Sequence, residues 1–361
     1  MRPPTSASPL ANIAPRRVCL IKPSALGDVV QTLPLLDVLR QKFPAAEISW
    51  VIRSDLANLL EGHPALAETL VFHRTGGWRA WRDLLKTLYQ RRFDLVLDLQ
   101  GLLRTGVMTL ATRAPWRVGL ETAREGSAFS CNYLIPETGR TVPAHARYWR
   151  IAEELGLADH PATAHIPVSA ADASSVAGQL AQLPRPLLAM HAGAGWVTKR
   201  WPVEKFAEIA RRFSGSIVAV GSPGEASLAE AIVTAAADAG RPALNLAGKT
   251  TLKQLAAVLQ SVDLMVSNDS GPMHLAAAVG TPVAGIFTCT SPVLSGPAPD
   301  SPNGVRHVLI SADVPCRASY KKTCPHSGPG HLCCLADLSV ERVWQAVEQL
   351  QTQQTLIRRP A

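Results

Sequence analysis

Short apolar runs alternate with helix-like segments along this chain of 361 residues, and that alternation restricts the possible folds most strongly. In the first half, the runs that precede such segments lie at residues 18–22, 48–52, 70–72 and 95–99. The pattern restarts in the second half, with runs at residues 187–190, 217–220, 243–246, 264–267 and 283–287. Strands that alternate with helices form parallel sheets covered by helices. The sequence therefore predicts an α/β protein with two Rossmann-like, doubly wound domains.

A stretch at residues 157–169 that contains Pro161 and Pro167 marks the boundary between the two halves. Residues 1–16 are rich in Pro, Ala and Ser and lack the apolar core of a signal peptide, which predicts a disordered, dispensable leader. The remaining boundaries that we predict are a first domain at 17–160, a linker and first helix at 161–185, a second domain at 186–338, and a final helix and tail at 339–361.

Composition excludes several classes of protein. No apolar run reaches the ~18 residues that a membrane span needs, so we expect a cytoplasmic protein with reduced cysteines. The net charge of +8 suits anionic ligands or anionic membranes. Nucleic acid is not an expected partner, because the sequence contains no zinc finger, RNP or basic-region pattern.

Three predicted turns at strand ends hold most of the chemically informative residues: Ser24-Ala-Leu-Gly-Asp28, residues 191–202, and Asn268-Asp-Ser-Gly-Pro-Met-His274. Ligands of paired doubly wound domains bind at the carboxyl ends of the strands, so we expect all three turns to face one cleft. In the third turn, Ser270 is a natural cap for a helix that has Pro272 in its first turn. The N-terminus of such a helix favours phosphate, which predicts a diphosphate site.

The second turn supplies glycines and a cation to the same predicted site. Gly193 and Gly195 suit a backbone that wraps around phosphates, and Lys199 offers a mobile positive charge. The glycine spacing matches neither the dinucleotide fingerprint nor the Walker pattern. A nicotinamide-dependent oxidoreductase on twin Rossmann domains is therefore the weaker alternative.

These motifs, in this order, resemble the ADP-heptose:lipopolysaccharide heptosyltransferases, the glycosyltransferase family 9 enzymes with the GT-B fold. The resemblance runs from about Arg17 to the end of the chain. It rests on Ser24-x-x-Gly-Asp28, Lys199-x-Trp-Pro202 and Asn268-Asp-Ser-Gly-x-x-His274, with support from Asp98-Leu-Gln-Gly101 and Thr122-Ala-Arg-Glu125. It implies inverting transfer of heptose from ADP-heptose to the inner core of lipopolysaccharide, on a lipid A–Kdo or heptosyl-Kdo acceptor, without metal ion or cofactor.

The resemblance also implies roles for individual residues. Asp28 matches the proposed general base, although a carboxylate at that position could simply cap the next helix. Lys199 matches the lysine that neutralises the diphosphate. The residues that match the nucleotide-sugar site are Gly27, Lys199, Glu225, Asp269, Ser270, Gly271 and His274.

Structural alternatives remain open for three residues of that set. Asp269 is expected to accept hydrogen bonds from heptose hydroxyls, since a carboxylate repels a diphosphate, but it could close the turn instead. Glu225 is expected to hold the ribose hydroxyls, or it is an ordinary glutamate of a first helical turn. His274 taken alone would be interpreted as a packed histidine.

The acceptor and the sugar remain open on the sequence. Arg124 resembles an acceptor-side arginine, suited to a carboxylate or phosphate. The Thr122–Glu125 match favours transfer of the first heptose to Kdo, whereas the late cysteines favour transfer of the second. Another family 9 sugar donor, or a non-catalytic sugar-nucleotide-binding protein of the same fold, are further alternatives.

Two segments invite other functions. The helix predicted at 78–93 carries Trp78, Trp81 and Tyr89 on an apolar stripe beside several arginines, which suits either peripheral attachment to anionic lipid or a core-facing helix with a solvated basic face. The cysteines 316, 324, 333 and 334 lie near His326 and His331 but lack paired zinc-knuckle spacing, so we expect no metal there.

Overall fold

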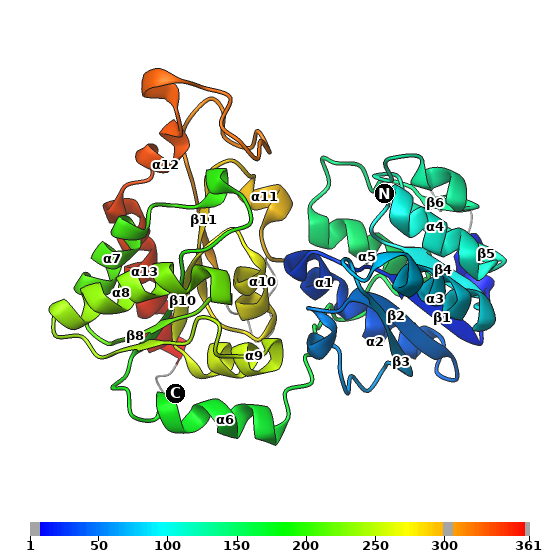
Figure 1. Cartoon of the computed structure of the whole chain (residues 1–361), viewed down its shortest axis with the longest axis horizontal. Coiled ribbons are helices and arrows are strands. Elements are labelled where there is room, and N and C mark those ends of the chain that lie inside the picture. Colours follow the sequence, from blue (N-terminus) through cyan, green and yellow to red (C-terminus); the bar gives the residue numbers. More distant parts are fainter. Residues whose placement is uncertain (1–7, 299–305, 358–361) are drawn as a thin grey trace. The chain divides into compact units, whose positions relative to one another are not determined.

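The computed structural model describes residues 8–298 and 306–357, and the chain divides into two compact units between Pro167 and Val168. Each unit contains one sheet of six parallel strands with helices packed on it (Figure 1). The prediction of an α/β protein with two doubly wound parallel sheets is therefore confirmed. The division falls inside the proline-containing stretch at 157–169.

In the first unit the strands lie in the order β3-β2-β1-β4-β5-β6. The strands are β1 (Arg17–Ile21), β2 (Glu47–Arg53), β3 (Glu68–Phe72), β4 (Leu95–Asp98), β5 (Trp116–Leu120) and β6 (Tyr133–Ile135). The central strands β1 and β4 are buried almost throughout, because helices cover both faces of the sheet, and this explains their uninterrupted apolar runs. The strand order reverses between β1 and β4, so a ligand is expected beyond the carboxyl ends of these two strands.

The helices of the first unit form two groups. Helix α3 (Gly77–Gln90) packs against α4 (Leu103–Thr112), while α5 (Ala144–Glu154) packs against α1 (Leu26–Thr32) and α2 (Pro34–Lys42). The apolar residues of the segment 29–43 recur at helical spacing, which by itself predicts one continuous helix. It is divided because Pro34 cannot continue the ladder of α1 and instead begins α2.

In the second unit the strand order is β12-β11-β10-β7-β8-β9, with the reversal between β7 and β10. The strands are β7 (Leu187–His191), β8 (Ser216–Ala219), β9 (Ala243–Asn245), β10 (Leu264–Asn268), β11 (Val283–Phe287) and β12 (Val308–Ser311). The helices are α6 (Ala170–Leu180), α7 (Val203–Arg212), α8 (Ala226–Asp238), α9 (Leu252–Ser261), α10 (Gly271–Ala278), α11 (Pro292–Ser295), α12 (Cys333–Asp337) and α13 (Val340–Ile357).

Both flanking segments that we had separated from the second domain belong to its core. Helix α6 starts at a capping box of Ser169 and Asp172 and packs against α9. Helix α13 packs against α7, β10, β11 and β12, and buries Val343, Val347 and Leu350. The boundaries predicted at 161–185 and 339–361 therefore do not separate independent parts, because each helix buries its apolar face within the second unit.

The leader predicted at 1–16 is also corrected in part. Residues 1–7 lie outside the described residues. In the rest of this segment, Pro9–Asn12 form a 3-10 helix that contacts α5, and the side chain of Leu10 is fully buried. Burial of this leucine offsets the entropy lost on ordering the segment.

Three strands escaped prediction. Strand β5 carries Arg117, whose guanidinium donates to the carbonyls of Ala114 and Ser130, and β6 has only three residues. Strand β12 and helix α12 both lie in the late part of the chain, where the sequence pattern predicts neither element. Strand β5 is interrupted by the charged Arg117, and the edge strands β6 and β12 are only three and four residues long, so none of them has the apolar run from which a strand is recognised.

None of the described helices combines the length and apolar character needed to cross a membrane.

Candidate functional site

The turn from β10 to α10 lies at the strand reversal of the second unit. Asn268 is the last residue of β10, Gly271 is the first of α10, and Asp269 and Ser270 connect them. Ser270 occupies the N-cap position, but the prediction that it caps the helix is wrong. Its Oγ instead lies 3.0 Å from His191 Nδ1 and 3.2 Å from Ser267 Oγ, so its hydrogen bonds point back to the strand ends rather than to α10.

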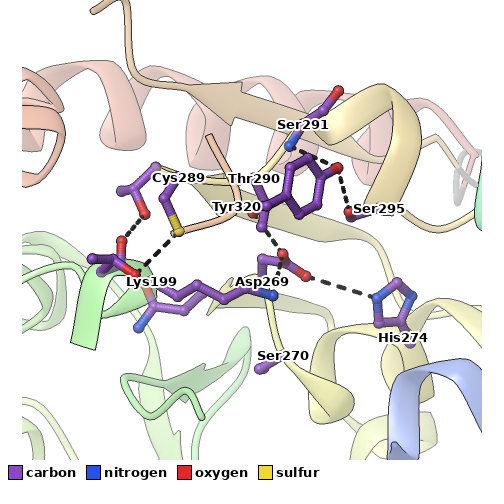
Figure 2. Close-up of polar contacts among 12 residues, drawn as sticks. Lys199, Asp269, Ser270, His274, Cys289, Thr290, Ser291, Ser295 and Tyr320 are labelled. Carbon is purple, nitrogen blue, oxygen red and sulfur yellow. Dashed lines mark hydrogen bonds and ion pairs between the residues drawn. The ribbon is translucent and has the colours of Figure 1, made fainter. Parts of the chain in front are cut away.

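Asp269 is held in the turn by two side chains from other strand ends (Figure 2). Lys199 Nζ donates to its Oδ2 at 2.7 Å, and Thr290 Oγ1 donates to the same oxygen at 2.6 Å. The side chain of Asp269 is only 5% exposed, so these donors compensate for the loss of water around its charge. The other carboxylate oxygen of Asp269, Oδ1, lies 3.9 Å from His274 Nε2. The two groups form an ion pair only when the histidine is protonated.

The loop that carries Lys199 is fixed by the fully buried amide of Asn268. The side-chain oxygen of Asn268 accepts from Trp201 N at 3.1 Å, and its nitrogen donates to Ala192 O at 2.8 Å. Both ends of the loop are thereby tied to β10. Within the loop, the Lys199 ammonium lies 4.7 Å from the centroid of the Trp196 ring, which adds a cation–π contact.

A segment from the cysteine-rich region packs on the same loop (Figure 2). Thr198 Oγ1 donates a hydrogen bond to Lys321 O at 2.7 Å and accepts one from Cys289 Sγ at 3.3 Å. Tyr320 N donates to Cys289 O at 2.8 Å, and its hydroxyl lies 2.9 Å from Ser295 Oγ. The late segment thus buttresses the turn that positions Lys199, a role that its composition did not suggest.

Glu225 lies beyond the end of β8, against the glycine loop. Its Oε2 contacts His191 Nε2 at 3.4 Å and accepts from the nitrogen and the hydroxyl of Ser222, both at 2.8 Å. The hydrogen bond from His191 is the main reason that the pKa of Glu225 falls to about 2, against the opposing effect of burial. A Cβ added to Gly193 would collide with the Glu225 side chain, so a larger residue there requires Glu225 to move. Gly195 has open space around it and carries no such constraint.

The site of the first unit is built around Asp28. It lies in the first turn of α1, beside Gly27, and its side chain is 40% exposed. Lys22 Nζ lies 3.5 Å from Oδ2, and the Tyr148 hydroxyl donates to Oδ1 at 3.2 Å. Burial alone would lower the pKa of Lys22, but the neighbouring Asp28 carboxylate and the Tyr148 hydroxyl outweigh burial and raise that pKa above its ordinary value. Burial, followed by the charge of Asp28, raises the pKa of Tyr148 to about 12, so its phenol stays a donor.

The motifs that follow β4 and β5 meet each other in the first unit. Asp98 is 1% exposed and accepts from Gln100 N, Gly101 N and Thr105 Oγ1, each at 3.0 Å. Burial raises the pKa of Asp98 despite these donors. Gly101, which has a positive φ of 62°, offers its carbonyl to Arg124 N at 2.8 Å. Asp98 is therefore a turn-forming residue, and it brings the exposed Arg124 to the carboxyl end of the sheet.

The structure brings together most of the predicted residues within each unit. Lys199, Asp269 and His274 are in contact in the second unit, whereas Gly27 belongs to the first. Sequence reasoning missed four residues that hold the predicted ones: Lys22, Tyr148, His191 and Thr290. Lys22 and His191 directly end apolar strands, which is a usable signal, but Tyr148 contacts Asp28 across 120 residues and no local pattern indicates it.

The cysteine-rich segment holds free thiols. All seven cysteines are free, and Cys316 Sγ lies 3.9 Å from Cys333 Sγ. Across residues 8–298 and 306–357, no group of three or more His, Cys, Asp or Glu side chains is arranged to hold a metal ion.

Comparison with known proteins gives a consistent family. The model of glycosyltransferase family 9 (heptosyltransferase) matches residues 81–328. Lipopolysaccharide heptosyltransferase 1 of Pseudomonas aeruginosa is 31% identical over 333 residues, which are 86% of this chain and 88% of the relative. Lipopolysaccharide core heptosyltransferase OpsX of Haemophilus influenzae is 29% identical over 297 residues, 80% of this chain and 84% of the relative.

Solved structures agree on the fold. ADP-heptose lps heptosyltransferase II of E. coli is similar with a TM-score of 0.74 at 24% identity, over 94% of this chain and 99% of that one. A family 9 glycosyl transferase from Veillonella parvula gives a TM-score of 0.76 at 23% identity, over 96% and 100% of the two chains. The match of the family model to well over half of the sequence decides the assignment, and the chain belongs to glycosyltransferase family 9, the heptosyltransferase family.

Proposed function

We propose that this glycosyltransferase transfers heptose from ADP-heptose to the inner core of lipopolysaccharide. The observation that carries the proposal is the ion pair between Lys199 and the buried Asp269 beside the N-terminus of α10, at the strand reversal of the second unit. A cation and the N-terminus of a helix at one strand end suit the diphosphate of a nucleotide sugar. The named relatives that act on lipopolysaccharide support heptose as the sugar and the core as the acceptor.

In the donor site, the role of Lys199 is to neutralise the charge that develops on ADP as the glycosidic bond breaks. The backbone N–H groups of Ser270 and Gly271 bind the diphosphate, and the Glu225 carboxylate binds the ribose hydroxyls. Asp269 has one oxygen engaged by Lys199 and Thr290, so it orients the lysine while Oδ1 and His274 face the sugar. In this proposal the transfer inverts the configuration at the anomeric carbon and uses no metal ion.

In the acceptor site, Asp28 is the general base that removes the proton of the attacking hydroxyl. Its 40% exposure lets an acceptor reach the carboxylate, and the Lys22 ammonium stabilises the ionised form that a base requires. Arg124 is exposed and binds a carboxylate or phosphate of the acceptor. A carboxylated sugar such as Kdo fits that preference.

The test of this function is a transfer assay with purified protein. ADP-heptose is incubated with deacylated lipid A–Kdo or with its heptosylated form, and both ADP release and the glycosylated product are measured. Product with the first acceptor alone assigns transfer of the first heptose, and product with the second alone assigns the next step. No product with either acceptor would reject lipopolysaccharide as the substrate, while release of a different nucleotide from another sugar donor would reject ADP-heptose.

We further propose that the enzyme works at the cytoplasmic face of the inner membrane, attached through the outer face of α3 and α4. Trp78 is 71% exposed, Leu103 and Leu110 are 58% and 52% exposed on one side of α4, and Phe129 beside α4 is 93% exposed. Cationic residues accompany them, namely Arg79, Arg82, Lys86, Arg104 and Arg113. Apolar side chains among cations are typical of surfaces that bind anionic lipid.

Vesicle flotation tests the attachment. We expect the protein to float with vesicles that contain phosphatidylglycerol and to remain behind with pure phosphatidylcholine. The variant with Leu110→Asp and Phe129→Asp should lose flotation, whereas Val293→Asp, at a 70% exposed position of the second unit, should not. Flotation that is equal for all three proteins, or absent in all three, would reject this surface.

A further inference from the structure

His191 stands at the centre of three neighbouring strand ends. It is the last residue of β7, which lies between β10 and β8 in the sheet. Its ring contacts Ser270, which follows β10, through Nδ1, and Glu225, which follows β8, through Nε2. The side chain is 3% exposed, so the imidazole is enclosed and both of its nitrogens have partners.

We propose that His191 is a positioning residue that couples the phosphate end of the donor site to its ribose end. The inference rests on the proposed function, in which Ser270 binds the diphosphate and Glu225 binds the ribose. His191 touches neither ligand group in this scheme. It acts through Ser270, whose turn presents the N–H groups that bind phosphate, and through the carboxylate of Glu225.

The contacts of Glu225 give the first reason. Every hydrogen bond that the described part of the chain makes to this carboxylate goes to Oε2, from His191 and from Ser222. Oε1 lies against the loop backbone at Gly193, where an added Cβ would collide with it. Holding Oε2 therefore fixes the orientation of Oε1, and a vicinal diol needs an acceptor at a defined place.

The contacts of Ser270 give the second reason. A serine at the N-cap normally accepts from a backbone N–H of the first turn, which takes up its oxygen. Here the hydroxyl contacts His191 and Ser267 instead, so it does not compete with a phosphate for the N–H groups at the start of α10. When Nε2 carries the proton and faces the carboxylate, Nδ1 accepts a hydrogen bond from the Ser270 hydroxyl. This hydrogen bond fixes the direction of the hydroxyl.

Nucleotides that lack either the ribose hydroxyls or the second phosphate measure the two parts of the donor site separately. The affinity ratio of ADP to 2′,3′-dideoxy-ADP measures recognition of the ribose hydroxyls, and the ratio of ADP to AMP measures recognition of the second phosphate. We expect His191→Phe to reduce both ratios by about tenfold, the scale of a hydrogen bond to a charged group. Adding Glu225→Gln to His191→Phe should then cause little further loss in the first ratio.

Two conservative variants keep the test informative if His191→Phe does not fold. Gln can place its amide near the position of Nε2, so His191→Gln should preserve the ribose ratio and lose the phosphate ratio. Asn reaches only the position of Nδ1, so His191→Asn should show the opposite result. Ratios equal to those of the wild type in both variants, or an equal loss of both ratios in both, would overturn the proposal.

The outcome is distinguishable from failure of the proposed function. If the wild type prefers another nucleoside diphosphate, ADP-heptose is rejected as donor, and the same ratios are measured with that nucleotide. In transfer assays, the His191 variants should raise the KM of the donor and leave the KM of the acceptor unchanged. A rise in both would indicate a general structural role instead.

Discussion

Lys199 and Asp269, 70 residues apart in the sequence, form an ion pair at 2.7 Å whose carboxylate is almost completely buried. Thr290 supplies a second donor to the same oxygen, at 2.6 Å. The pair presents a positive group at the strand reversal and holds it in one orientation without help from solvent. This arrangement gives the site an organised cation before any donor binds.

Replacement of Lys199 by Met should separate catalysis from stability. Loss of the cation should reduce kcat by about 10²–10³. It also leaves a buried carboxylate with one partner fewer, at a cost of about 3–5 kcal/mol in the free energy of unfolding. The double variant with Asp269→Asn should regain stability but not activity, which urea unfolding and ADP release measure. Recovery of activity in the double variant would contradict the role of the lysine.

Replacement of Asp28 by Asn should reduce kcat by about 10²–10⁴, because the base is lost while the shape is kept. Binding of ADP, measured by calorimetry, should not change, since the predicted phosphate ligands lie in the second unit. Tyr148→Phe is the matched control: it removes one hydrogen bond to Asp28 and should have a smaller effect on kcat. Equal activity of Asp28→Asn and the wild type would reject the base.

Two glycines of one loop provide a matched steric test. The methyl group of Gly193→Ala would collide with Glu225 Oε1, and we expect it to weaken ADP binding by about tenfold, the scale of an overpacked site. Gly195→Ala meets no atom within 4 Å and should bind ADP as the wild type does. Similar affinities for the two variants would mean that Glu225 is not fixed against this loop when nucleotide binds.

The depressed pKa of Glu225 predicts how stability depends on pH. A carboxyl whose pKa falls from 4.5 to about 2 on folding contributes stability that is complete above pH 4.5 and is lost as the pH falls toward 2. At about pH 5.5 the free energy of unfolding of the wild type should exceed that of Glu225→Gln. This difference should be smaller at about pH 3. Urea titrations at both values measure the gap, and a gap that stays constant would contradict the prediction.

Some of the site was predictable because the relevant residues are adjacent in the chain. The turn at 268–274 carries its glycine, its proline and its histidine within one strand–helix connection, so local rules are enough to place it. The capping role of Ser270 was wrong for the opposite reason. Its hydroxyl has a choice between a local N–H and His191, 79 residues away, and only the sheet brings the second partner close.

The sequence by itself determined two parallel, helix-covered sheets, because buried strands must be apolar throughout and the helices between them must be amphipathic. It also determined which turns carry the chemistry. Only the tertiary structure decided the partners of those turns: Lys22 and Tyr148 for Asp28, Thr290 for Asp269, and His191 between Ser270 and Glu225. Parallel strands are joined by long crossovers, so residues that meet at one sheet edge are distant in sequence, and no local pattern records their contact.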